Sequence, residues 1–293
     1  MAVTNFGAVK AGLLASLRAG SGESRGTTQA PDNSKNVFSY FRPPFEFTDG
    51  IGGAAAATTG AVGVLLTGDG QAFTATVIGD ASASAPYISA HARGLVIALD
   101  ASDTNDGCTI DLGYGLSGAE IANARGAYVV GTDDAFYLRV RLDIGDVSDT
   151  ARCVVGFVKG GFVDTGLHTA YTDYAVLNVN AGDIIIETRL NSGTASTTDT
   201  TQNVADYATT GDVYDLEVRV SSSGIVNFLI NGAEPTVDVT SFTFDSGDTV
   251  NAIFSVALAG AGAGDPTVVL HEWESGFISS RGLDTIFDTS SGV

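Results

Sequence analysis

The feature of this chain that most constrains its fold is a long succession of short segments rich in Val, Ile, Phe and Tyr, separated by Gly, Asp, Ser and Thr. Short apolar segments bounded by turn-forming residues are typical of β-strands, and many of them in series predict a sandwich or a jelly roll. We expect strands at residues 63–67, 72–78, 94–99, 136–142, 153–159, 174–179, 184–190, 214–220, 225–230, 249–258 and 267–273. The sequence therefore predicts an all-β fold, an antiparallel jelly roll or β-sandwich, with almost no helix.

The strongest local turn signal is the dipeptide Asn231-Gly232. Both central positions of a type I′ hairpin turn need positive φ, which Asn and Gly adopt most readily. Upstream, residues 214–220 alternate apolar and charged side chains, which is the pattern of a strand with one buried face. We therefore expect two successive hairpins, with Asn231 and Gly232 as a structural turn.

Composition limits the partners and the redox chemistry of the chain. Its 293 residues are 44% hydrophobic, enough for one large β domain or two small ones. The net charge of −20 argues against nucleic-acid binding, because a phosphate backbone repels carboxylates. This acidity favours solubility, and cation binding or a basic partner surface stays open. Cys108 and Cys153 are too few for a disulfide scaffold, so we expect each to be a small buried hydrophobic residue.

The N-terminal segment does not match a targeting or membrane-spanning sequence. Lys10 lies inside its short apolar stretch rather than ahead of it, and the stretch is too short to cross a bilayer. We therefore expect synthesis and folding in a cytoplasm, with no membrane partner.

Three regions follow from the distribution of apolar residues. We predict an extended N-terminal arm at residues 1–48 with a short helix at 8–18, a β-sandwich at 49–275, and an extended C-terminal tail at 276–293. The arm either docks on a neighbouring subunit or folds over its own domain, and the tail either lies on a surface or forms a final edge strand. The predicted anchors are isolated aromatic residues in polar surroundings: Phe38, Tyr40, Phe41, Phe45, Phe277 and Phe287.

Several segments resemble a known family. FYLRVRLDIGDVSDTARCVVGFV, YTDYAVLNV, GDIIIETRL and YDLEVRVSSSGIVNFLINGAEP are similar to strands of the concanavalin A-like lectin/glucanase jelly roll, the laminin-G-like group. The most specific element is the last one, an amphipathic strand, a Gly turn and a strand that ends at Asn231-Gly232. The resemblance covers about residues 130–275. It implies the fold, which often serves sugar binding and glucan cleavage.

The glucanase signature of this family is only partly present. It is a strand with Glu-x-Asp-x-Glu, which places a nucleophile and an acid/base about 5 Å apart on one face. The nearest match here runs from Asp183 to Glu187, and apolar Ile185 stands at its middle position. HEWESG, with Glu272 and Glu274, is a second weak match, and there is one tryptophan where sugar-cleaving clefts use several aromatic platforms. We therefore expect no enzymatic activity and no catalytic residues.

Metal and cofactor signals are also weak. The three histidines are His91, His168 and His271, and their spacing matches no zinc motif. A calcium-like loop offers oxygen ligands from Asp100, Asp103, Asn105 and Asp106. It lacks the bidentate acid that closes an EF-hand, and ordinary turns use the same residues, so metal binding stays open. Since no G-x-S-x-G or phosphate-binding loop occurs, we expect no cofactor.

A second resemblance concerns composition. A sandwich with Gly/Ala/Thr-rich strands and extended termini resembles the head decoration (cement) proteins of tailed bacteriophages. It implies a non-enzymatic virion structural protein on the capsid surface, made in the host cytoplasm, with the major capsid protein as partner. A homo-oligomer, first of all a trimer, would fit a threefold position of the lattice. The alternative is a tail-fibre or spike lectin-like module that binds host glycans.

Overall fold

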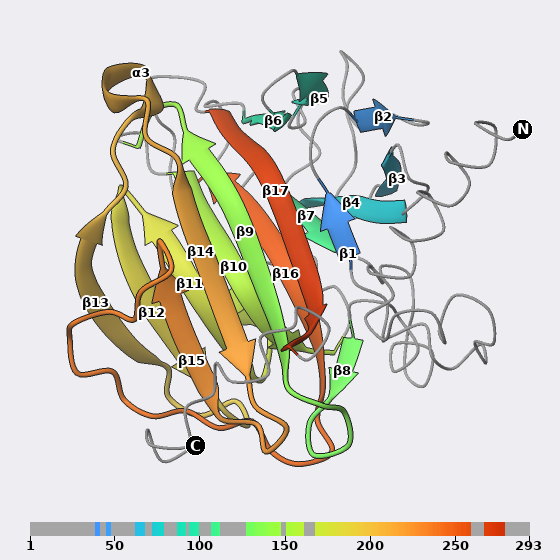
Figure 1. Cartoon of the computed structure of the whole chain (residues 1–293), viewed down its shortest axis with the longest axis vertical. Coiled ribbons are helices and arrows are strands. Elements are labelled where there is room, and N and C mark those ends of the chain that lie inside the picture. Colours follow the sequence, from blue (N-terminus) through green and yellow to red (C-terminus); the bar gives the residue numbers. More distant parts are fainter. Residues whose placement is uncertain are drawn as a thin grey trace, which may run out of the picture.

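The computed structural model describes residues 39–41, 45–47, 62–67, 72–78, 87–91, 94–99, 107–111, 127–147, 151–160, 168–258 and 267–278. Over these ranges the chain is nearly all β, with the short 3-10 helix η3 (His168–Ala170) and the single helical turn α3 (Tyr207–Thr210). Two antiparallel sheets lie one behind the other (Figure 1). The predicted all-β antiparallel sandwich is therefore confirmed. None of the helices in the described part is long and apolar enough to cross a membrane.

Sheet A is the smaller sheet and forms the front layer in Figure 1. Its described strand pairings are all antiparallel. Its strands follow the order β15 (Val226–Ile230), β14 (Tyr214–Val220), β9 (Phe136–Ile144), β17 (Thr267–Phe277), β6 (Gly94–Ala98) and β5 (Tyr87–His91), and β1 (Ser39–Phe41) also pairs with β17.

Sheet B is the larger sheet and lies behind sheet A. Its strands follow the order β13 (Ser196–Asn203), β12 (Asp183–Arg189), β11 (Tyr174–Asn180), β10 (Ala151–Lys159), β16 (Thr249–Leu258), β7 (Gly107–Asp111), β4 (Ala72–Ile78), β3 (Val62–Thr67) and β2 (Phe45–Phe47). β8 (Ala127–Val129) pairs with one end of β16.

The core lies between the two sheets, because alternate residues of each strand point inward. On β9 these include Leu138 and Val140, and on β10 they include Val155 and Phe157, all fully buried. Each such side chain contributes about 1.5–3 kcal/mol relative to exposure. The period-2 pattern of the sequence thus fixes which face of each sheet meets the other.

An aromatic cluster closes the core at the end of β17. Tyr128 stacks on Phe136 with ring centroids 4.4 Å apart, and its hydroxyl lies 2.9 Å from the Ser275 hydroxyl. Phe277 packs against Tyr128 with its side chain 4% exposed, and the Ile278 N–H donates to the Ala135 carbonyl. The tail that we expected from residue 276 therefore does not include residues 276–278. The apolar core draws them in as the end of a strand, which was the alternative interpretation.

Two short described strands lie within the predicted N-terminal arm. Within residues 1–48, β1 pairs with β17 and β2 pairs with β3, so the backbones of Tyr40, Phe41 and Phe45 belong to the sheets. Strand pairing gives main-chain N–H and C=O groups hydrogen-bond partners within the protein, whereas in an extended arm these groups would bond to water. Phe38, Phe287 and the helix expected at 8–18 lie outside the described residues.

The turn at Asn231 and Gly232 connects two hydrogen-bonded residues. Asn231 has a φ of 52° and Gly232 a φ of 80°, as a type I′ turn requires. Ile230 and Ala233 exchange N–H···O=C bonds of 2.8 and 3.1 Å across it. The Asn231 side-chain oxygen also accepts the N–H of Asp215, which ties the turn to β14.

Candidate functional site

A row of polar residues crosses the outer face of sheet B. Strand pairing places Thr76 of β4 opposite Thr109 of β7, Thr109 opposite Ser255 of β16, Ser255 opposite Val154 of β10, and Val154 opposite Asn178 of β11. Their chain neighbours point into the core, so this row faces away from sheet A. All five side chains are nonetheless buried. We call these residues the outer row.

The hydrogen bonds of the outer row are incomplete. Thr109 and Ser255 pair through their hydroxyls at 2.7 Å. Within the described ranges, the buried Oγ1 of Thr76 and Oδ1 of Asn178 have no hydrogen-bond partner. A buried polar atom without a partner costs about 1–3 kcal/mol, so these two atoms are candidates for a further hydrogen bond.

Next to the outer row lies a cluster of His168, Asn178 and Glu187. His168 Nε2 lies 2.8 Å from Glu187 Oε2, and the Asn178 amide donates to Glu187 Oε1 over 2.7 Å. Burial alone would raise the pKa of Glu187, but these two bonds and the charge of Arg152 lower it below its ordinary value. Glu187 is therefore an ionised acceptor at neutral pH.

Two further atoms of this cluster have no partner in the described part of the chain. These are Nδ1 of His168, whose side chain is 1% exposed, and Nε of Arg152 on β10. The His168 ring is fixed edge-on against the ring of Tyr174, 4.9 Å away. The orientation of the unpartnered Nδ1 of His168 is therefore fixed.

Arg189 holds η3, and hence His168, in place over the sheet. Its guanidinium donates to four main-chain carbonyls, those of Thr169, Tyr171, Ser192 and Gly193, at 3.0–3.4 Å. Because the planar guanidinium presents its donors in a rigid fork, it fixes the segment before β11 to the turn after β12. His168 therefore reaches Glu187 without belonging to a strand.

Apolar side chains surround the polar atoms. A second buried cluster on this outer face contains Val154, Val158, Tyr171, Tyr174, Val176 and Ile253. Low-dielectric surroundings strengthen each hydrogen bond made there and raise the cost of each one left unmade. Arg152 and Glu187 are only partly buried and connect the cluster to solvent.

The carboxylates of the predicted glucanase-like ladder do not form a catalytic pair. Asp183, Ile185 and Glu187 share the outer face of β12, as the spacing requires, and Asp183 is exposed. Four residues along a strand separate the first and last by roughly 13 Å, far from the ~5 Å of a retaining pair. Both oxygens of Glu187 are already engaged.

Glu274 of the second weak match lies on the outer face of sheet A, away from Glu187. It accepts the Tyr137 hydroxyl at 2.6 Å and pairs with Arg139, which also binds Asp215 through its guanidinium. This charged face borders a shallow depression of about 580 Å³. Its ion pairs satisfy one another, so they give no sign of a missing ligand.

The other candidate residues are not brought together. His271 binds Asp143 on sheet A at 2.7 Å, and no side chain of His91 is described. In the ranges that the structure covers, no group of three His, Cys, Asp or Glu side chains is arranged to hold a metal ion. The calcium-like loop, with Asp100, Asp103, Asn105 and Asp106, lies outside those ranges.

Sequence reasoning did not find the outer row. Its residues Thr76, Thr109, Val154, Asn178 and Ser255 come from five strands, and no local spacing connects them. One signal was available. Asn178 interrupts the apolar strand YAVLNVN, whose side chains are buried on both faces of the sheet. A polar residue there needs a partner.

Comparison with known proteins finds similarity only at the level of three-dimensional shape. No family model matches the sequence, and no curated protein matches it. Among similar solved structures are the carbohydrate recognition domain of Emp46p in its potassium-bound form (10% identity, 69% of this chain and 87% of that one, TM-score 0.44) and an alginate lyase from Pseudomonas aeruginosa (12%, 64% and 85%, 0.42).

A third similar structure is botulinum neurotoxin type C, whose cell entry depends on interaction with two ganglioside molecules. It is 9% identical, with a TM-score of 0.43, over 82% of this chain. The chain spans about half of the toxin chain, 51% of its length. Similarity at this level carries no argument about function, and the antiparallel β-sandwich rests on the strand pairings described above.

Proposed function

We propose that this protein is a non-enzymatic carbohydrate-binding module that holds a glycan on the outer face of sheet B. The observation that carries the proposal is the set of unpartnered buried atoms there: Thr76 Oγ1, Arg152 Nε, His168 Nδ1 and Asn178 Oδ1. Arg152 Nε donates, Asn178 Oδ1 accepts, and the Thr76 hydroxyl does either. Because Nε2 of His168 donates to the ionised Glu187, Nδ1 of a neutral His168 ring accepts. A sugar hydroxyl both donates and accepts, and four strand spacings, roughly 19 Å, separate Thr76 from Asn178. An oligosaccharide that lies along the row would therefore satisfy this mixture where an ion of one sign would not.

The apolar surroundings suit the same ligand. Val154 and Val176 lie beside the polar atoms on the outer face. Ligand sites combine apolar walls with a few placed polar groups, and the C–H surface of a sugar ring provides the matching apolar side. A glycan is therefore favoured over a small inorganic ion.

The environment of Glu187 supports binding rather than cleavage. A general acid needs a raised pKa so that it holds a proton near neutral pH, and the pKa of Glu187 is lowered. In the described ranges no second carboxylate stands within a retaining distance of it on β12. Incubation with laminarin, agarose, carrageenan and peptidoglycan should release no reducing sugar, and release that vanishes in Glu187→Gln would contradict a non-enzymatic function.

The binding test uses Thr76→Val, which removes an unpartnered hydroxyl and keeps the side-chain shape. A glycan array identifies the ligand, and calorimetry measures its affinity for the wild type and the variant. We expect the variant to bind about tenfold more weakly and to unfold no earlier, because the lost hydroxyl bonded only the ligand.

The matched control is Thr109→Val, whose hydroxyl pairs with Ser255. It should destabilise the fold by about 1 kcal/mol. If Thr76→Val binds glycan as tightly as the wild type, or destabilises the fold as Thr109→Val does, the hydroxyl has a structural role and the proposed site is wrong.

Decoration of a phage head, with a trimer and the major capsid protein as partner, stays a prediction from the sequence. Carbohydrate binding is the preferred proposal because specific unpartnered side-chain atoms support it. Of the predicted capsid anchors, Phe277 is buried in the chain's own core, where it cannot contact a partner. The lectin-like alternative agrees with the proposed site.

A further inference from the structure

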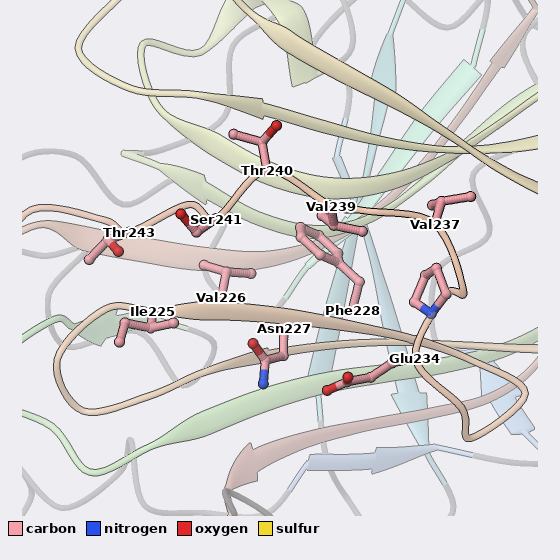
Figure 2. Close-up of a pocket in the computed structure, with 11 residues that line it drawn as sticks. Ile225, Val226, Asn227, Phe228, Glu234, Val237, Val239, Thr240, Ser241 and Thr243 are labelled. Atoms are coloured by element: carbon pink, nitrogen blue, oxygen red, sulfur yellow. The ribbon is translucent and has the colours of Figure 1, made fainter. Parts of the chain in front are cut away.

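A second candidate site lies at the free edge of sheet A. A groove of about 490 Å³ separates β15 from the following loop (Figure 2). Val226 and Phe228 point from the strand toward the loop, which presents Val239 to them, while Asn227 and Glu234 lie on the other side of the strand (Figure 2).

The loop is fastened to β15 at both ends and bows away between them. At one end Ile230 and Ala233 exchange main-chain bonds, and at the other the Val226 N–H donates to the Phe242 carbonyl over 3.0 Å. Between these points, loop residues 234–241 span a stretch that strand residues 227–229 cover. The extra loop residues cannot pair with the strand, so the groove opens opposite Phe228.

Phe228 is the residue whose main chain this opening leaves without a partner. Ile225 and Asn231 bond to the β14 side of the hairpin, so alternation directs the N–H and C=O of Val226, Phe228 and Ile230 toward the loop. Val226 and Ile230 find partners there. Within residues 168–258 neither main-chain group of Phe228 does, although the residue is 4% exposed. Main-chain groups without a partner in the chain are satisfied by water or by a bound molecule.

We propose that this groove docks a short extended segment of a partner polypeptide, one residue of which pairs with the main chain of Phe228. A residue in extended conformation presents its N–H and C=O on the same side, which is the complement of Phe228. Because the loop closes the groove at both ends, the segment is short: a chain end or the tip of a loop.

The lining defines the chemistry of that segment. Pro235, Val237 and Val239 form an apolar wall that suits a small aliphatic side chain. Glu234 is exposed at the rim, and none of the described residues that line the groove is cationic. The partner segment therefore carries a small apolar residue next to Lys or Arg. This inference concerns a different sheet from the glycan site and does not depend on it.

The test uses the full chain, labelled with ¹⁵N, and the capped tripeptide acetyl-Lys-Val-Lys-amide. We expect the peptide to shift the Phe228 amide resonance in a saturable titration. Methylation of the Val nitrogen keeps the charge and the side chains but replaces the N–H donor with a methyl group, so affinity should fall about tenfold. Acetyl-Glu-Val-Glu-amide should bind more weakly than the Lys peptide.

Glu234→Gln should weaken binding of the Lys peptide, whereas Asp199→Asn, an exposed change on β13, should leave it unchanged. Equal affinity of the methylated and parent peptides would show that charge alone drives binding, and would overturn the proposal. So would a titration in which chito-oligosaccharide, rather than the peptide, shifts Phe228.

Discussion

The ring of Phe277 lies 5.7 Å from the ring of Tyr128, at an interplanar angle of 65°, inside the core at the end of β17. Phe277→Ala should therefore lower the free energy of unfolding by about 3–5 kcal/mol, because it removes a buried ring and leaves a cavity. Urea denaturation measures this. A residue anchored on a partner surface would change monomer stability by less than about 0.5 kcal/mol, so a value in that range would restore the tail interpretation.

The turn at Gly232 offers a test of backbone strain separate from packing. A Cβ at this position would meet nothing within 4 Å, but φ is +80°. Gly232→Val should cost about 1–3 kcal/mol through conformation alone, and Gly232→Asn, which tolerates positive φ, should cost less. Equal melting temperatures for Val, Asn and Gly would mean that the turn adopts another conformation.

The two thiols should be inert in the folded protein. Cys108 and Cys153 flank Val256 from opposite sides, so two strand spacings, roughly 9–10 Å, separate them, which is too far for a disulfide. Burial raises the pKa of Cys108 to about 12 and also raises that of Cys153. Ellman's reagent at pH 8 should react with neither thiol until urea unfolds the chain. Rapid reaction in native buffer would show that this part of the core opens.

The Glu187 cluster predicts a pH dependence of stability. Since the folded-state pKa of Glu187 is lowered, its ionised form stabilises the fold above its ordinary pKa of 4.5, and this contribution disappears as pH falls through the lowered value. Wild type should therefore be more stable than Glu187→Gln at pH 6, and the difference should shrink toward pH 3. Exposed Glu234→Gln serves as the control. A difference that grows on acidification would mean that the carboxylate is not held by His168 and Asn178.

Truncation separates the sheets from the predicted arms. A chain of residues 39–278 retains every described strand and should melt cooperatively. Ending instead at residue 275 removes Phe277 and should lower the melting temperature by about 5–10 °C. If the termini bind a capsid, the 39–278 chain should bind phage heads stripped of the native protein far more weakly than the full chain does. Equal binding would place the contacts on the sandwich.

The sequence predicted the strands whose apolar residues alternate, such as β14 and β16, because periodicity reports burial directly. It did not predict β13, whose sequence STTDTTQN is almost wholly polar. That strand lies at the edge of sheet B and has little to bury, so its pairing with β12 determines its conformation. The short strand β7 was not predicted either, because it directly follows the Asp-rich segment at 100–106, whose composition indicates a turn.

The candidate site was beyond sequence reasoning for a different reason. Glu187 was noticed as part of a carboxylate ladder, but its partners His168 and Asn178 are 19 and 9 residues away in the chain. The outer row joins Thr76 to Asn178 only through the order of strands in sheet B. Non-local pairing of this kind leaves no fixed spacing in the sequence.

The measurement that tests the carbohydrate site most directly is the ¹⁵N NMR spectrum of the histidine side chains, recorded with and without the glycan that the array selects. Saturating glycan should shift Nδ1 of His168 and the side-chain amide of Asn178, while the amide of Phe228 in the groove beside β15 should stay unchanged. If His168 and Asn178 keep their free-state resonances while the glycan is bound, the ligand lies elsewhere and the proposed site is wrong.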